Sequence, residues 1–221
     1  LLLFIPFFYS CNFGSEDELD VDVSGVDLEP VKIHRYGMEL FSVNPESLKK
    51  ELVELKDEFW FFLDADLEDT LNLIQIRTYI TDPALIKLAE DAFEEYPDLV
   101  ELENRLIDAV KHYKYYFPEV RSPLVYSYIS GIDFEFPVRK VDTVVIIGLD
   151  NYLGSNYVEY RKLGLPKYRR HEMQRQYVVR DIMKIYAREK IDRQKMGNKL
   201  LDEMIAAGKE WYFIEAMIPS N

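Results

Sequence analysis

The chain has 221 residues, the length of one domain, and 48% of them are hydrophobic, which is enough for a sizeable buried core. Its 40 acidic residues outnumber its 27 Lys and Arg residues, so the formal net charge is −13. This shortage of positive charge argues against binding to nucleic acid and against a polybasic grip on an anionic membrane surface.

The chain begins with an uncharged apolar run, LLLFIPFFY, that is followed by the single cysteine, Cys11. The run is far shorter than the about 20 apolar residues that span a bilayer, but it suits the hydrophobic region of a secretory signal. A small residue before a cysteine at the end of such a run is typical of a bacterial lipobox, in which the thiol is acylated. We therefore expect residues 1–11 to be a signal-peptide remnant with the lipid on Cys11. The alternative is a buried apolar strand with an inert cysteine.

Residues 12–29 are mostly acidic and polar, and we expect a flexible tether there. A globular domain should follow over residues 30–221. Its first strand is expected near residues 31–35, where apolar and polar residues alternate. Asn44 and Asp82 each precede a proline, a combination that begins helices. The predicted helices lie over residues 45–59, 67–78, 83–96 and 99–113.

Three β-rich segments occupy the middle of the chain, over residues 124–130, 134–138 and 143–149. The last, TVVIIGL, is continuously apolar, which is typical of a strand covered on both faces. Asp142 and Asp150 bracket this strand and would lie about 26 Å apart at 3.3 Å per residue, too far to act together. We read Asp150 and Asn151 as turn residues.

Two helices are expected at the end of the chain, over residues 178–189 and 198–217. In the second, six residues are predicted to face inward: Leu201, Met204, Ile205, Gly208, Trp211 and Tyr212. The whole pattern predicts an α+β fold, a mainly helical single domain with a small buried β-sheet.

The sequence offers little support for catalysis. It has no GxGxxG motif, no Walker loop and no GxSxG motif. His171-Glu172 could begin the HExxH motif of zinc peptidases, but Arg175 stands where the second histidine is needed. We therefore expect no catalytic residues, no cofactor and no metal site.

A basic segment in this acidic chain is the best candidate for binding a partner: Lys167, Tyr168, Arg169 and Arg170. Arginine forks suit carboxylates and phosphates. The alternative is a solvated loop that balances acidic neighbours.

Five stretches of the chain resemble the family of the gliding-motility lipoprotein GldB, in that family's order: KHYKYYFPEV (111–120), VYSYISGIDFE (125–135), GLDNYLG (148–154), GLPKYRR (164–170) and MIAAGKEWYFIEAMIP (204–219). The resemblance implies a protein that continues beyond Asn221. A more distant similarity to the core of thermolysin-type zinc peptidases implies a degenerate core, since the helix over residues 178–189 has no histidine.

The resemblance implies a non-enzymatic, lipid-anchored protein of the cell envelope, placed at the outer membrane, that supports gliding motility or associated surface machinery. Other envelope proteins would be its partners, and nucleic acid would not. Two alternatives stay open. One is a divergent peptidase-like hydrolase, and the other is a peptide-binding module that uses the aromatic residues around Tyr113–Phe117 and Tyr152.

Replacing the cysteine tests the anchor. Cys11→Ser should release the protein from membranes, because the several acyl chains of a lipobox cysteine make anchoring stable. Ser10→Ala, which keeps a small residue before Cys11, should leave it attached. Fractionation after a salt wash measures both, and a Cys11→Ser protein that still sediments with membranes would contradict lipidation.

Overall fold

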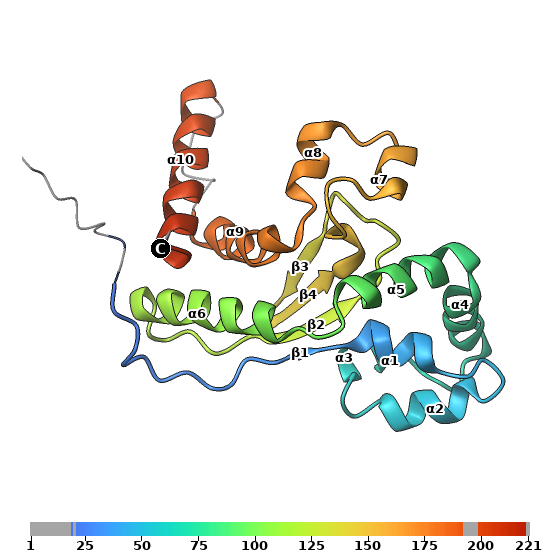
Figure 1. Cartoon of the computed structure of the whole chain (residues 1–221). Helices are drawn as coiled ribbons and strands as arrows, with labels where there is room; N and C mark the ends of the chain where they lie inside the picture. Colours follow the sequence, from blue (N-terminus) through green and yellow to red (C-terminus); the bar gives the residue numbers. More distant parts are fainter. Residues whose placement is uncertain (1–18, 20, 192–198, 220–221) are drawn as a thin grey trace, which may run out of the picture.

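The computed structural model describes residue 19, residues 21–191 and residues 199–219. Its centre is a four-stranded sheet in the order β1-β2-β4-β3 (Figure 1). The strands are β1 (Ile33–His34), β2 (Leu124–Tyr128), β3 (Val138–Val141) and β4 (Val144–Gly148). β1, β2 and β4 are parallel, whereas β3 is antiparallel to β4. The α+β fold class is therefore confirmed.

β4 lies between two other strands, and all five of its residues are buried. Because side chains alternate along a strand, Val145 and Ile147 belong to one hydrophobic core, and Val144 and Ile146 belong to another. The prediction of a strand covered on both faces is thus correct.

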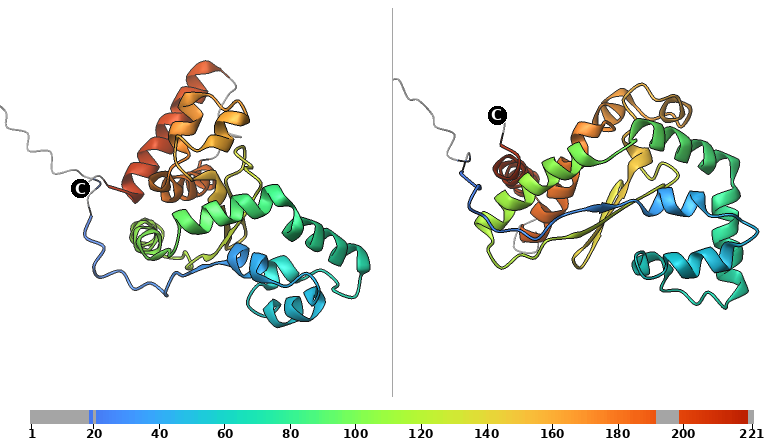
Figure 2. Two further views of the ribbon diagram at one scale, coloured as in Figure 1. Left: turned by 45° about the vertical axis from the view of Figure 1, so that its right-hand side comes forward. Right: turned by 60° about the horizontal axis from the view of Figure 1, so that its bottom comes forward.

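The helices form three groups around this sheet (Figure 2). One core is shared with α6 (Val100–Tyr116), α9 (Val178–Lys190) and the end of α10 (Leu200–Met217). The second core is shared with four helices: α1 (Tyr36–Ser42), α2 (Leu48–Leu55), α3 (Trp60–Leu63) and α4 (Thr70–Thr81). A third cluster joins residues that follow β2 to α5 (Pro83–Glu95) and to the region of α7 (Val158–Lys162) and α8 (Lys167–Glu172). The short helices η1 (Leu149–Asn151) and η2 (Arg175–Tyr177) complete the fold.

Local signals placed most helices correctly. Asp82 caps α5, where its carboxylate accepts hydrogen bonds from the backbone N–H groups of Ala84 and Leu85. Two segments differ from expectation. α1 follows the first strand without a sequence signal that we used, and the strand expected over residues 134–138 starts at Val138 instead. Residues 134–137 form the turn that leads into it.

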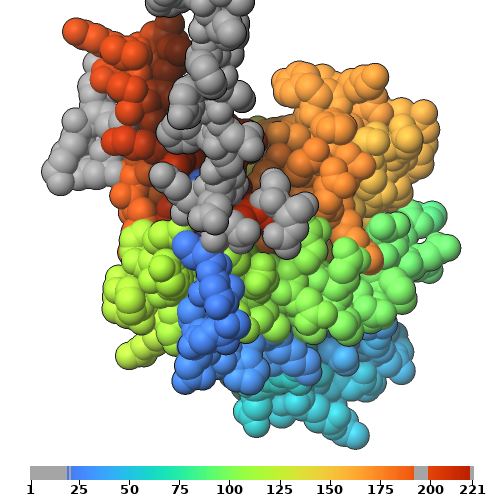
Figure 3. All heavy atoms as spheres, turned by 60° about the vertical axis from the view of Figure 1, so that its left-hand side comes forward, coloured from blue at the N-terminus to red at the C-terminus, as the bar shows by residue number. Residues whose placement is uncertain are grey.

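The inward face predicted for α10 is wrong. Trp211 is 57% exposed and Tyr212 is 61% exposed, and the other predicted residues are also exposed or open to solvent. The spacing of apolar residues shows which of them share a face of the helix, but it does not show which face packs against the rest of the protein. α10 packs mainly through its C-terminal end, and its N-terminal part rises away from the sheet (Figure 1). In Figure 3 this part of α10 projects beyond the surface formed by α6.

Part of the acidic segment over residues 12–29, which we expected to be a flexible tether, belongs to the folded domain. Leu19 and Val23 are buried, and Leu28 packs against the core shared with α6 and α9. Cys11 lies outside the described residues. Among the residues that are described, no helix combines the length and the apolar composition needed to cross a bilayer.

A charge placed on β4 should prevent folding. Ile146→Asp buries an unpaired carboxylate between the sheet and the helices of the second core, which should cost about 4 kcal/mol or more. Val53→Asp, on the exposed side of α2, is the control and should cost within about 0.5 kcal/mol. Melting curves and circular dichroism compare the two, and an Ile146→Asp protein with an unchanged melting temperature would contradict the assignment.

Candidate functional site

A groove of about 760 Å³ runs along β3. One wall is continuous from Phe134 to Val141, and the other consists of residues of α9 between Arg180 and Glu189. Asn151, Tyr152 and residues of α8 line it as well. The two walls meet at one end, where Lys140 of β3 binds Glu189 of α9, and α8 reaches the other end, where Arg169 lies over the Phe134 ring.

Positive charge gathers in this groove although the chain as a whole is strongly acidic. Six basic and four acidic side chains line it, in a protein whose net charge is −13. The basic residues are Arg139, Lys140, Arg169, Arg180, Lys184 and Arg188. Three of them, at positions 180, 184 and 188, follow each other at four-residue spacing and so share one face of α9.

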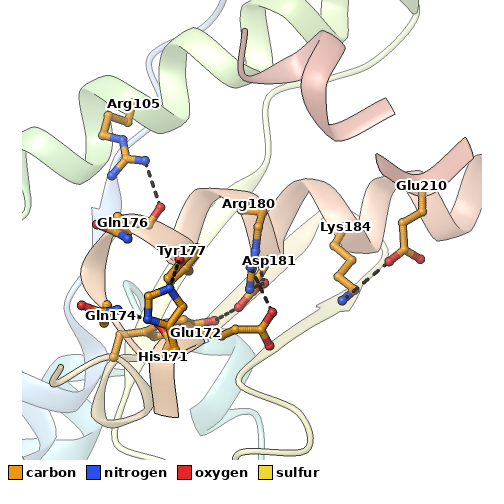
Figure 4. Close-up of polar contacts among 11 residues, drawn as sticks. Arg105, His171, Glu172, Gln174, Gln176, Tyr177, Arg180, Asp181, Lys184 and Glu210 are labelled. Carbon is orange, nitrogen blue, oxygen red and sulfur yellow. Dashed lines mark hydrogen bonds and ion pairs between the residues drawn. The ribbon is translucent and has the colours of Figure 1, made fainter. Parts of the chain in front are cut away.

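Arg180 is held in place by two carboxylates, those of Asp181, which is partly buried, and of Glu172, whose Oε1 atom lies 3.3 Å from Nη1 of Arg180 (Figure 4). Its Nε and Nη2 atoms donate to Oδ1 of Asp181 at 3.0 and 2.7 Å, and its guanidinium lies 4.3 Å from the centre of the Tyr177 ring. Burial raises the pKa of Asp181, and the charge of Arg180 opposes that rise. The pKa of Tyr152 is raised well above its usual value by burial, so its hydroxyl stays protonated and donates to Oδ2 of Asp181 at 3.0 Å.

Lys184 and Arg188 both face Glu210, a buried residue of α10. The Lys184 Nζ atom lies 3.6 Å from Oε1 of Glu210, and the Arg188 Nε atom donates to Oε2 at 2.9 Å. Two cations thus meet the single carboxylate of Glu210, so their charges exceed the charge of that group. The same carboxylate links α10 to α9 and so fixes the wall.

Asp150 positions the turn that leads into β3. It is fully buried, and it accepts hydrogen bonds from the backbone N–H groups of Ser130 and Ile132 at 2.7 and 2.6 Å. Gly131 and Ile132 have φ values of 75° and 62°, a conformation that is unfavourable for a β-branched residue. The carboxylate stabilises that turn, so Asp150 is a structural anchor within η1.

The four residues of the basic segment Lys167–Arg170 do not share one surface in the structure. Arg169 lines the groove, whereas Lys167 and Tyr168 are not part of its lining, and Tyr168 is 76% exposed. Arg170 turns toward the protein, where Nε donates to Leu165 O at 3.1 Å and Nη1 donates to Ser155 O at 3.0 Å. Of the four residues, only Arg169 therefore joins the cations of α9.

The three histidines lie in different parts of the fold. His34 contacts Glu58 beside β1, His112 is buried on α6, and His171 contacts the Tyr177 hydroxyl. Within the described ranges, no group of three His, Cys, Asp or Glu side chains is arranged to hold a metal ion. Of the aromatic residues that we weighed as a binding surface, Tyr113 and Tyr152 belong to the core shared with α6 and α9, and Tyr152 also lines the groove. Tyr115 and Tyr116 are exposed. The peptide-binding alternative stays a prediction.

These features define a mainly helical α+β domain with a charged groove between an edge strand and a helix. The chain belongs to the family of the gliding motility protein GldB, whose family model matches residues 16–221, almost the whole chain. It is therefore a member of a family of gliding-motility-associated lipoproteins. No curated protein matches the chain, and no solved structure does.

Sequence reasoning missed the charges of α9. We searched the helix for histidine and found none, but the segment RDIMK, residues 180–184, places Arg180 and Lys184 at the same four-residue spacing. These two cations share one face of a helix whose opposite face is strongly apolar, and that pattern could have indicated a charged surface on this helix. Nothing in the sequence indicated that β3 would lie beside it.

The two arginines of α8 should behave differently. Arg170→Glu removes two hydrogen bonds to backbone carbonyl groups and should cost about 1–3 kcal/mol. Arg169→Glu should cost within about 0.5 kcal/mol, because it loses only a distant ring contact. Urea denaturation of both variants measures the costs, and equal costs would show that Arg170 does not hold this loop.

Proposed function

We propose that this protein is a non-enzymatic, lipid-anchored protein of the cell envelope that supports gliding motility, or the surface machinery associated with it, by holding another envelope protein in the groove beside β3. Cys11 would attach it to the outer membrane. Family membership supports the gliding role, and the groove supplies a place for the partner.

The cation pair on α9 carries the proposal of a binding role. In zinc peptidases, two histidines four residues apart on one helix face bind the metal ion. At that spacing α9 presents Arg180 and Lys184 to the groove. Two cations repel a metal ion and attract a carboxylate, and Asp181 and Glu172 hold Arg180 in a fixed orientation. The arrangement suits binding of an acidic partner better than metal-assisted hydrolysis.

The segment Lys167–Arg170 would extend this contact at its outer side. Arg169 already lines the groove, and the exposed Lys167 and Tyr168 stand next to it in sequence. Arg170 would contribute indirectly, because it fixes the loop on which α8 begins.

Photo-cross-linking in living cells tests the proposal. A photoreactive amino acid at Arg188, in the groove wall, should capture an envelope protein. The same amino acid at Lys50, which is exposed on α2 and does not line the groove beside β3, should not. Lys184→Glu, introduced into the protein that carries the photoreactive amino acid at position 188, should abolish capture, because it replaces attraction with repulsion. Lys184→Glu combined with Arg188→Glu should abolish gliding for the same reason.

Three outcomes would contradict the proposal. The first is equal capture from both positions, and the second is normal gliding of the double variant. The third is cleavage of the captured protein by the purified domain, which would favour the hydrolase interpretation.

A further inference from the structure

We infer that the groove binds an extended acidic segment of the partner, which adds as a fifth strand to the outer edge of β3 and places its acidic side chains on the cations of α9. The inference rests on the proposed function and names the chemical class that the groove recognises. It follows from the hydrogen bonding of the sheet, the ion pairs at its edge and the spacing of the charges.

β3 is the last strand of the sheet on its side. Among the described residues, the outer side of β3 pairs with no other strand. The groove lies along this strand for its whole length. An unpaired strand edge offers a row of backbone donors and acceptors to another chain, which is the basis of recognition by strand addition.

The register identifies the backbone groups that face outward. Leu124 N donates to Thr143 O on the β2 side of β4, and Gly148 N donates to Pro137 O on the β3 side. Because successive residues of a strand point their backbone groups to opposite sides, the pairs 139–146 and 141–144 bond within the sheet. Val138 and Lys140 then direct their N–H and C=O groups away from β4.

The charged side chains of β3, Arg139 and Lys140, do not block its open edge. Charges on an edge strand usually discourage the addition of another strand. Here the Lys140 Nζ atom contacts both carboxylate oxygens of Glu189, at 2.8 and 2.9 Å, and Arg139 is paired with Asp133. Both side chains are held by the protein itself, so they leave the backbone of β3 open.

The spacing of the α9 cations suits alternate residues of such a strand. Four residues of a helix advance about 6 Å along its axis, and two residues of a strand advance about 6.6 Å. Because α9 packs against β3 and both line the groove, acidic side chains at alternate positions of an added strand can reach Arg180, Lys184 and Arg188 in succession. The intervening side chains would face the opposite side of the sheet.

A synthetic peptide tests this arrangement directly. The probe is a fluorescein-labelled peptide of sequence VEVEVEV with blocked ends, and fluorescence anisotropy measures its binding to the soluble domain. We expect binding at least about tenfold tighter than that of VQVQVQV, because charge-assisted contacts are lost with glutamine. Equal binding of the two peptides, or no binding of either, would overturn the inference.

N-methylation of the peptide separates strand addition from simple charge attraction. One version is methylated at the three glutamate nitrogens and another at the valine nitrogens. Since only one of the two sets faces β3 in an added strand, one version should lose binding and the other should keep it. An equal effect of the two methylations would exclude strand addition.

A pair of protein variants tests the same edge from the other side. Lys140→Pro removes an outward-facing donor and leaves the bonds to β4 intact, a position where proline is tolerated in edge strands. Lys140→Thr loses the same ion pair but keeps the donor. The two proteins should melt at similar temperatures, and only Lys140→Pro should lose peptide binding, by about tenfold or more.

The cross-linking experiment distinguishes failure of this inference from failure of the proposed function. If Lys140→Pro and Lys140→Thr bind the peptide equally while cross-linking from Arg188 persists, the groove binds a partner by another mode. If cross-linking from Arg188 is absent, the proposed function itself fails.

Discussion

The burial of β4 on both faces is the constraint on which the rest of the structure depends. Its alternating side chains divide the protein into two hydrophobic cores, and its two neighbours, β2 and β3, are fixed by backbone bonds on either side. Within the part of the chain that the structure describes, β3 pairs with β4 alone, and α9 packs on the same core beside its other edge. The groove is thus a consequence of the way the central strand is covered.

The charged side chains of α9 determine what the groove can bind. An isolated buried carboxylate is costly, and Asp181 and Glu210 are each stabilised by cations of α9. The same contacts hold Arg180, Lys184 and Arg188 along one side of the groove. A protein with a net charge of −13 therefore presents its cations where an acidic segment can meet both them and an open strand edge. Positioning of this kind reduces the cost of ordering side chains when a partner binds.

The sequence predicted those parts of the fold that local patterns determine. The sequence predicted the continuous apolar run of β4, the helix start at Asp82 and the helix over residues 99–113, and the structure confirms all three. The orientation of α10 could not be predicted, because an apolar face on a helix does not show which side of the helix packs against the rest of the protein. The candidate site was found only in part. Arg169 was identified, but the contribution of α9 depends on β3, a strand that lies far from it in the chain.

Amide hydrogen exchange along β3 tests the central claim, an open strand edge beside fixed cations, most directly. Arg139 and Val141 bond to β4 in this account, so their amide hydrogens should exchange slowly, whereas those of Val138 and Lys140 should exchange much faster. Addition of an acidic strand-forming peptide should slow the fast pair and leave the slow pair unchanged. Uniform protection of all four amides in the free protein would contradict the account.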